Sequence, residues 1–312
     1  MKPTARLYLT FGVLTLALFA ISSSSVLTKM CDAPAETIAL YRVAIASGLY
    51  YAMARAGGSS FRSAYTPARL KLAAASGLFL AVHFAAWITS LHYTSVASSV
   101  VLVVTSPVWV ALGGLIFLGE KPRPLQLVGM AVTLAGSAVV SGADVTLDPR
   151  SLFGNLLALV GAMAAAGYWL IGRRLRAEMD TFPYVSVVYA ACAVFTLTLI
   201  LALRRPVWGF SQKTYLLLIA IALFPQVVGH TSLNWALKYF SAAAVAVITL
   251  GEPIGATILA WLILGQTVTP VQAAGGAIIL VGVALALRAE LFAAQGVAAA
   301  GRRPEAKAAK RF

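Results

Sequence analysis

Residues Ser90–Gly119 read SLHYTSVASSVVLVVTSPVWVALGGLIFLG, and residues Ala236–Gly265 read ALKYFSAAAVAVITLGEPIGATILAWLILG. When the first stretch is shifted by 146 positions, from 90 to 236, Pro107 falls on Pro253. Other matched pairs are Leu91 with Leu237, Tyr93 with Tyr239, Gln126 with Gln272 and Gly136 with Gly282. A gap-free register over about 45 residues is a strong sign of an internal repeat.

The composition is that of a membrane protein. Sixty per cent of the 312 residues are apolar and only 11% are charged, whereas soluble domains carry about 25% charged residues. The apolar residues form runs of about 20, the length of α-helix that crosses roughly 30 Å of hydrocarbon. The sequence therefore predicts an all-α membrane protein with ten transmembrane helices. The predicted spans are residues 7–29, 36–54, 69–91, 95–117, 124–141, 152–172, 182–203, 214–237, 241–264 and 270–288.

The ten spans divide into two predicted repeats of five, residues 1–141 and 152–288, followed by a basic tail at 289–312. Because five is an odd number, the second repeat is expected to be inverted in the membrane relative to the first. Inverted repeats are a common transporter architecture, with the substrate site near the midplane at the repeat interface. The first span begins like a signal peptide, but its apolar part is longer than a signal core, so we expect no cleavage.

The distribution of basic residues predicts the topology. The net charge is +14, and the basic residues lie in short breaks between spans and in the tail. That placement is typical of the positive-inside rule and not of a nucleic-acid-binding surface. An N-terminus in the cytoplasm puts most of them inside, so both termini are expected there. The exception is the loop with Arg204, Arg205 and Lys213, which this topology places outside.

Two charged residues, Arg42 and Glu252, lie well inside predicted spans. Charges at the bilayer centre cost roughly 2.5–3.5 kcal/mol on insertion scales, so they are candidates for function. Glu252 precedes Pro253, which weakens local helix hydrogen bonding. It could bind a substrate amine, carry a proton, or fasten its helix to another; its repeat counterpart is Ser106. Arg42 could attract an anionic group or support packing. Glu252 and Arg42 are therefore the candidate coupling or gating residues.

Polar side chains recur at helical spacing on two predicted spans. Gln226, His230 and Asn234 follow one another every four residues in the eighth span, and His83 and Trp87 do so in the third. Lipid cannot satisfy such groups, so each stripe should face a cavity or a partner helix. Either histidine alone could be a hydrogen-bonded packing residue. The candidate substrate-binding residues are His83, Trp87, Ser106, Gln226, His230, Asn234 and Glu252.

Other chemistry finds less support in the sequence. The histidines lack the companions that a metal site needs, and no metal, cofactor or catalytic residue is predicted. Cys31 and Cys192 lie in different segments, and no structural disulfide is expected. Tyr168 and Trp169, near the inner end of the sixth span, are expected at the lipid headgroups, with a cavity wall as the alternative.

Several motifs together resemble a known family. They are the stretch Leu91–Pro122, the GEP of Gly251–Pro253, Lys29 near the end of the first span, and Arg42 in YRVAIA. With them the chain is similar to the drug/metabolite transporter superfamily, in its EamA-type branch with two tandem repeats. The resemblance implies a ten-span carrier that exports amino acids or related small metabolites. It also implies a cavity lined by spans one, three, four, six, eight and nine. One departure is Gln266, where the second repeat often has glutamate.

We therefore expect a transporter in the cytoplasmic (inner) membrane, secondary-active or facilitative, that moves a small molecule by alternating access as a monomer or homodimer. Proton coupling through Glu252 is one hypothesis and facilitated diffusion is the other. The alternatives are a flippase-like carrier of lipid-linked or phosphorylated substrates, a channel, or a membrane-embedded enzyme. The sequence has no GxxxxGKS/T, HExxH or TVGYG motif, which disfavours an ATPase, a metalloprotease and a potassium channel.

Overall fold

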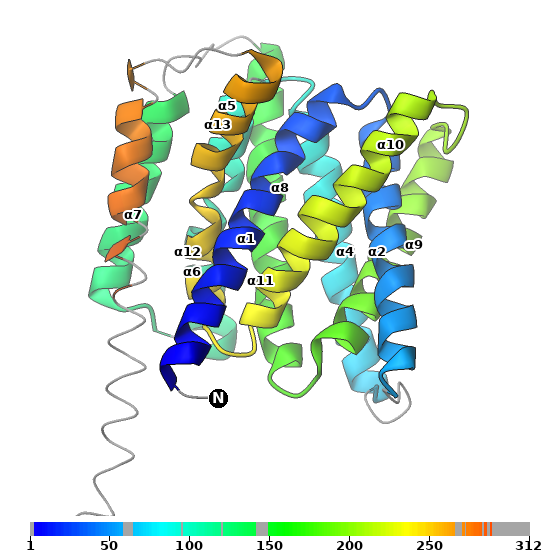
Figure 1. Ribbon diagram of the computed structural model, residues 1–312, viewed down its shortest axis with the longest axis horizontal. Coiled ribbons are helices and arrows are strands. Elements are labelled where there is room, and N and C mark those ends of the chain that lie inside the picture. Colours follow the sequence, from blue (N-terminus) through cyan, green and yellow to red (C-terminus); the bar gives the residue numbers. More distant parts are fainter. Residues whose placement is uncertain are drawn as a thin grey trace, which may run out of the picture.

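The computed structural model describes residues 3–58, 65–94, 96–119, 121–141, 149–265, 270–271, 273–282, 284–285 and 288; Gln266, Gln272 and the tail at 289–312 lie outside them. Every regular element in the described ranges is a helix, which confirms the all-α class (Figure 1). The elements are α1 (Pro3–Met30), α2 (Ala35–Ala56), α4 (Pro67–Ser90), α5 (Val96–Val103), α6 (Ser106–Gly113), the π-helix η1 (Gly114–Leu118), α7 (Pro124–Ser141), α8 (Pro149–Arg176), α9 (Thr181–Leu203), α10 (Gln212–Ile221), the π-helix η3 (Ala222–His230), α11 (Thr231–Ala236), α12 (Ala242–Thr249) and α13 (Glu252–Leu264).

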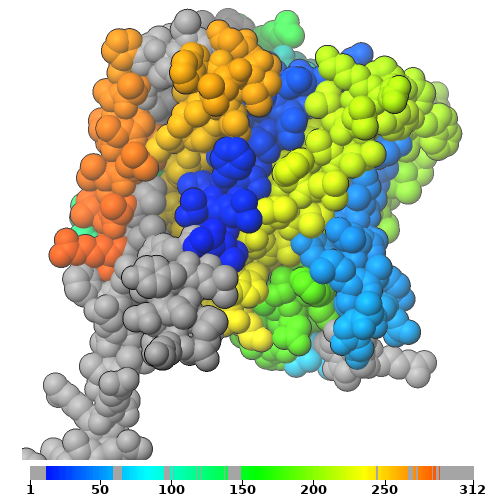
Figure 2. All heavy atoms as spheres, in the orientation of Figure 1, coloured from blue at the N-terminus to red at the C-terminus, as the bar shows by residue number. Residues whose placement is uncertain are grey.

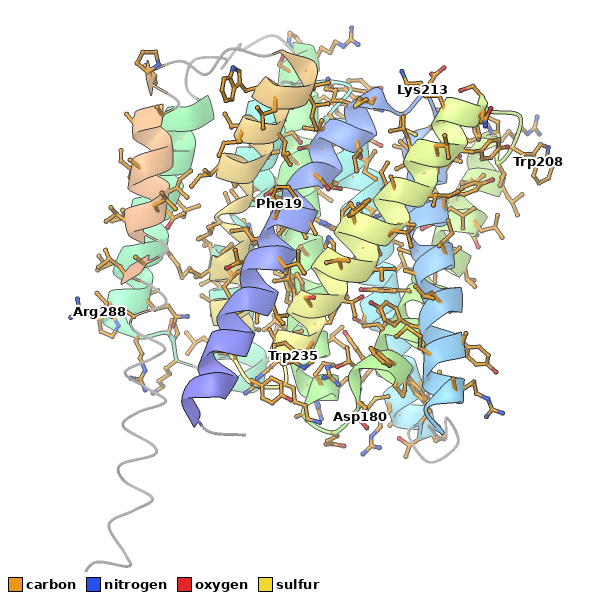
Figure 3. All side chains as sticks on the ribbon, in the orientation of Figure 1. Phe19, Asp180, Trp208, Lys213, Trp235 and Arg288 are labelled. Atoms are coloured by element: carbon orange, nitrogen blue, oxygen red, sulfur yellow. The ribbon has the colours of Figure 1, made fainter. Side chains whose placement is uncertain are left out.

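Six helical stretches are long and apolar enough to cross a membrane. They are Gly12–Met30, Pro67–Ser90, Pro149–Arg176, Thr181–Leu203, Gln212–Ala236 and Val245–Leu264, and shorter apolar helices lie at Ser106–Phe117, Pro124–Gly136 and Ala273–Gly282. Helix occupies most of the described part of each of the ten predicted ranges. Large apolar side chains point outward, among them Phe19 (Figure 3), Ile116 and Phe117, which are 61%, 71% and 76% exposed. Such a surface suits contact with lipid.

The predicted spans 95–117 and 241–264 are each broken in the middle. α5 ends before a turn at Val104 and Thr105, and α12 ends before a turn at Leu250 and Gly251. These turns are 146 positions apart, and their backbone hydrogen bonds correspond. Thr105 N–H donates to Leu102 O at 3.2 Å, and Gly251 N–H donates to Ile248 O at 3.2 Å. The next segments, α6 and α13, both carry proline in their first turn, where the missing N–H costs no intrahelical bond.

The helix packing is similar when each helix is replaced by its equivalent in the other repeat. α8 packs along α4, and α1 packs along α10, η3 and α11, the segments at the equivalent positions of the second repeat. The contact of α2 with α9 joins two equivalent helices directly. Figure 2 shows α1 lying beside the yellow segment η3–α11 on one face of the molecule. The duplication seen in the sequence is therefore present in the packing.

One extra residue distinguishes the eighth predicted span from the third. The side chain of Thr66 caps the start of α4, and that of Ser211, 145 positions later, caps the start of α10. α4 ends at Ser90, and the stretch formed by α10, η3 and α11 ends at Ala236, 146 positions later. The first therefore contains 24 residues and the second contains 25. A π-helix holds one more residue per hydrogen-bonded turn than an α-helix, and such segments are frequent at functional sites. The extra residue of the second repeat is accommodated in η3.

Candidate functional site

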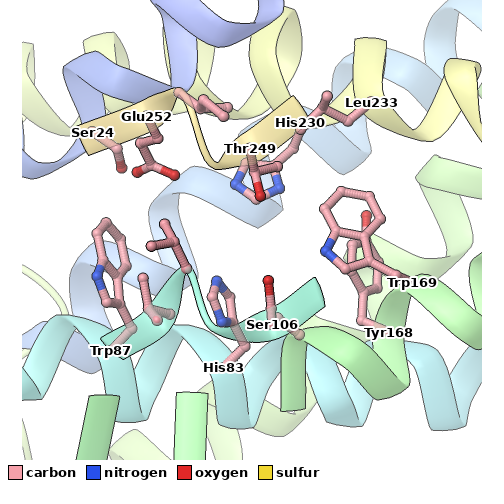
Figure 4. A pocket seen from close by; sticks show the side chains of 14 residues that line it. Ser24, His83, Trp87, Ser106, Tyr168, Trp169, His230, Leu233, Thr249 and Glu252 are labelled. Carbon is pink, nitrogen blue, oxygen red and sulfur yellow. The ribbon is translucent and has the colours of Figure 1, made fainter. Parts of the chain in front are cut away.

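A cavity of about 50 Å³ lies where the two broken spans meet (Figure 4). We call it the central cavity. Its walls come from α1, α4, α8 and η3–α11, and from the α5–α6 and α12–α13 breaks; these correspond to the six spans that the family resemblance implied. The lining residues are Ile21, Ser24, His83, Trp87, Val103, Val104, Ser106, Ala165, Tyr168, Trp169, His230, Leu233, Thr249 and Glu252.

Glu252 is the acidic residue of the central cavity. It is the first residue of α13, and its side chain points into the cavity beside Ser24 (Figure 4). A carboxylate in the first turn of a helix lies near the positive end of the helix dipole. Among the described residues no side chain hydrogen-bonds or ion-pairs with this carboxylate. The α13 backbone is held against α1, because Ser22 Oγ donates to Glu252 O at 3.3 Å. Glu252 is thus fixed at the cavity with its acidic group available to a ligand.

Arg42 lies directly behind Ser24, outside the cavity lining. It is fully buried; its Nε donates to Gln226 Oε1 at 2.8 Å, and its Nη1 donates to Ser24 Oγ at 3.2 Å. The guanidinium carbon lies 4.1 Å above the centre of the Phe84 ring, a cation–π distance. Arg42 therefore connects α2 to α1, α4 and η3. Gln226, predicted to bind substrate, instead lies outside the cavity lining and holds Arg42.

Two imidazole–indole stacks face the central cavity. His83 stacks on Trp87 with planes 4° apart, and His230 stacks on Trp169 with planes 5° apart, each pair at 6.2 Å between ring centres. His83 Nδ1 lies 2.9 Å from Gly161 O, so this nitrogen carries the hydrogen that it donates. Within the described part of the chain, Trp87 Nε1 and His230 Nδ1 are buried without a hydrogen-bond partner. Water or a ligand is expected to satisfy these atoms.

Asn234 serves a hydrogen-bond network beside the cavity. Its Nδ2 donates to Tyr168 Oη at 2.5 Å and to Tyr189 Oη at 3.2 Å, and it is fully buried. Tyr168 and Trp169 are 1% and 3% exposed and line the cavity. The prediction that these two aromatic residues lie at the lipid headgroups was wrong, because they face the interior between α8 and η3 instead of the membrane surface. Asn234 does not line the cavity itself.

The structure brings His83, Trp87, Ser106, His230 and Glu252 together around one cavity. Sequence reasoning did not select Ser24 or Thr249, which also line it. A signal for Thr249 existed in the repeat: Val103 and Thr249 are 146 positions apart and both line the cavity, as do Ser106 and Glu252. Ser24 lies in a run of four serines, whose members the sequence alone does not separate.

Neither native cysteine is among the residues that line the central cavity. Cys31 and Cys192 are buried and free. Across the described ranges, no group of three or more His, Cys, Asp and Glu side chains is arranged to hold a metal ion.

Comparison with known proteins places the chain in a family. The sequence profile described as the EamA-like transporter family matches residues 8–142 and again 152–288. The pseudopaline exporter CntI of Pseudomonas aeruginosa is 28% identical, with 86% of this chain and 93% of that protein aligned. A probable terminal-alkyne amino-acid exporter of Streptantibioticus cattleyicolor is 28% identical over 65% of this chain and 67% of that protein.

A solved crystal structure has the same fold. It superposes with a TM-score of 0.76 at 19% identity and covers 91% of this chain and 98% of its own. The two family matches coincide with the two halves that the sequence and the packing relate by duplication. The chain therefore belongs to the EamA-like transporter family, with two EamA-like repeats, and is a multi-pass protein of the inner membrane.

Proposed function

We propose that the protein is a secondary carrier that exports amino acids or related small metabolites by alternating access. One observation carries the proposal. The central cavity lies where two broken helices, one from each repeat, meet, and the carboxylate of Glu252 faces it. Transporter substrate sites are typically formed by such discontinuous helices at the repeat interface.

The proposed topology has ten transmembrane helices in two inverted repeats, residues 1–141 and 152–288, with both termini and the 289–312 tail in the cytoplasm. Arg69 ion-pairs with Glu178, and Lys238 with Asp180 at 3.3 Å, so the loops after α8 and α11 and the start of α4 meet at one end of the molecule. Further basic residues flank the helix ends there: Arg55, Lys71, Arg173 and Arg174. This end is the cytoplasmic one by the positive-inside rule. The opposite end carries Trp208 and Lys213 (Figure 3).

The groups around the cavity complement the charged and apolar groups of an amino acid. The Glu252 carboxylate is placed to accept a hydrogen bond from a substrate ammonium group. The buried guanidinium of Arg42 lies directly behind the side chain of Ser24, to which it donates a hydrogen bond. It therefore provides positive charge on the same side of the cavity as Glu252. The indoles of Trp87 and Trp169 offer apolar walls. One of the two relatives is named as a probable amino-acid exporter, which favours this substrate class.

The size of the cavity supports alternating access. A volume of about 50 Å³ holds a few water molecules, whereas small-molecule sites occupy roughly 300–1,000 Å³. A metabolite can therefore enter only when the surrounding helices separate. The breaks at Thr105 and Gly251 and the π-helical turns of η3 interrupt regular helix bonding next to the cavity. We propose that these are the places where the helices bend. Proton exchange through Glu252 remains our proposal for coupling.

Counterflow in proteoliposomes tests this function. Vesicles loaded with a mixture of unlabelled amino acids are expected to take up labelled external amino acid of one class, transiently above equilibrium, with a rate that saturates. The accumulation arises because a carrier returns loaded with internal substrate. Protein-free vesicles are the control. Folded protein that gives no counterflow with any amino acid or small metabolite would contradict the proposal.

A further inference from the structure

A second hollow, of about 580 Å³, lies between α2 and α11 beside the start of α9. We call it the inner groove. The segment α10–η3–α11 runs obliquely to α2, and the two diverge toward the end where Asp180 and Trp235 lie (Figure 1, Figure 3). That end is the cytoplasmic one in the proposed topology. The groove has the volume of a small-molecule site, which the central cavity of about 50 Å³ lacks.

A single hydrogen-bonded layer connects the inner groove to the central cavity. Thr231 lines the groove, and its Oγ1 lies 3.1 Å from Tyr189 Oη. Tyr189 and Tyr168 both accept from Asn234 Nδ2, and Tyr168 lines the central cavity. We call Tyr168, Tyr189, Thr231 and Asn234 the tyrosine layer. All four are at most 5% exposed, and within the described ranges Asn234 Oδ1 has no hydrogen-bond partner. A buried acceptor without a partner suits a layer that rearranges.

The hydroxyl groups of the groove have no counterpart in the first repeat. Thr231 and Ser232 line the groove, but the positions 146 residues earlier are Ala85 and Ala86. The first-repeat helix packs closely on its neighbour: a Cβ on Gly77 of α4 would lie 2.6 Å from Ala191 Cβ of α9. Polar side chains and open volume therefore occur together on one side of the pseudo-symmetric structure. Packing alone does not require hydroxyl groups in the second repeat.

We propose that the inner groove is an access subsite for the transported molecule, and that the tyrosine layer is the gate between it and the central cavity. The inference rests on the proposed function and extends it to the route from the cytoplasm. The ligand class is a zwitterionic molecule of amino-acid size with an apolar or aromatic side chain.

The chemistry of the groove supports that ligand class. Tyr50 and Phe182, whose ring centres are 5.3 Å apart, form an aromatic wall with Trp235 on the facing helix. Aromatic faces attract apolar groups and ammonium ions. At the mouth, Asp180 accepts from Lys238 Nζ at 3.3 Å. These two opposite charges can pair with the ammonium and the carboxylate of a zwitterion. A lipid acyl chain is apolar, so it can neither pair with these charges nor hydrogen-bond to the hydroxyl groups.

Cysteine protection tests the subsite. Ser232→Cys is prepared in a background with Cys31→Ser and Cys192→Ala and treated from the Asp180 side with a charged, impermeant methanethiosulfonate reagent. We expect modification that millimolar L-phenylalanine slows at least fivefold, phenethylamine slows less, and 3-phenylpropionate slows least. The matched control is Ala86→Cys at the repeat-equivalent position, which is 8% exposed and is expected to react slowly whether or not phenylalanine is present.

The outcomes separate this inference from the proposed function. An unreactive Ser232→Cys, as expected for a lipid-filled groove, or a reactive one that phenylalanine leaves unprotected, would overturn the subsite even if wild-type counterflow is normal. Protection without wild-type counterflow would keep the subsite and contradict the carrier. For the gate, Tyr189→Phe should speed modification of Ser106→Cys from the Asp180 side at least threefold, because it removes the hydroxyl shared by Thr231 and Asn234. An unchanged rate would exclude the tyrosine layer as the gate.

Discussion

Glu252→Gln is expected to slow amino-acid counterflow by roughly a hundredfold while the protein stays folded. The Glu252 side chain faces the central cavity, and glutamine keeps its size but can neither carry a negative charge nor release a proton. Hydrogen bonds to charged groups contribute about 1.5–3 kcal/mol, and about 2.8 kcal/mol corresponds to a hundredfold change. This loss is expected of a carboxylate that binds the substrate ammonium, the interaction from which the hundredfold change is derived.

The matched control is Glu178→Gln. Glu178 is an exposed carboxylate that ion-pairs with Arg69 at the end of the molecule, away from the cavity. Its replacement should leave counterflow within about twofold of wild type, because exposed ion pairs contribute about 0–1 kcal/mol. Thermal unfolding and gel filtration show whether each variant is folded. A wild-type counterflow rate in folded Glu252→Gln would exclude Glu252 as the ligand of the substrate ammonium.

Arg42→Lys is expected to lower both stability and transport. A lysine ammonium keeps the charge but lacks the planar fork that lets Arg42 donate to Gln226 and Ser24 while lying on Phe84. One buried partner is left without its hydrogen bond, at a cost of about 1–3 kcal/mol in the free energy of unfolding. Because Ser24 lines the cavity, its displacement should also slow counterflow at least tenfold. Thermal unfolding in detergent and counterflow in vesicles measure the two effects.

The control for this change is Arg55→Lys. Arg55 is exposed in the last turn of the same helix, α2, and there either cation can interact with water. The Arg55→Lys variant should unfold at the wild-type temperature and transport at the wild-type rate. If Arg42→Lys also matched wild type in both measurements, the fork of Arg42 would have no role in holding α1, α2, α4 and η3 together.

The helices and the repeat could be predicted because hydropathy and the 146-residue register both follow directly from residue type. The breaks within the fourth and ninth spans were harder to predict from the sequence. Pro107 and Pro253 occupy the first turns of α6 and α13, and proline there is compatible both with a new helix start and with a kink in a continuous helix. The π-helix η3 depends on a single extra residue, whose position is visible only once the N-caps of α4 and α10 are known.

The candidate site shows where residue type is insufficient. Tyr and Trp suit both a lipid headgroup belt and a buried cavity wall, so the sequence did not place Tyr168 and Trp169. Spacing put Gln226 and Asn234 on the same stripe as His230. The structure places only His230 at the cavity, because Gln226 has Arg42 of α2 as its partner and Asn234 has Tyr168 of α8. A polar residue on a buried helix face can serve a neighbouring helix as well as a ligand.

The native cysteines determine how cavity accessibility can be measured. Burial and the nearby Asp32 carboxylate raise the pKa of the Cys31 thiol to about 11. A thiol reacts as its thiolate, and at neutral pH a group with a raised pKa stays protonated, so Cys31 should react slowly. Cys192 is fully buried. Removing both thiols, as Cys31→Ser and Cys192→Ala, leaves an introduced cysteine as the reactive one.

In the proposed mechanism, the central cavity is reached alternately from the two sides of the membrane. Ser106→Cys in that background places a thiol in the central cavity, and a charged, impermeant methanethiosulfonate reagent is applied to each side of oriented vesicles in separate experiments. Alternating access predicts modification from either side, slowed in both cases by the amino acid that shows counterflow. Modification from one side only, or from neither, in a protein confirmed to be folded would contradict it.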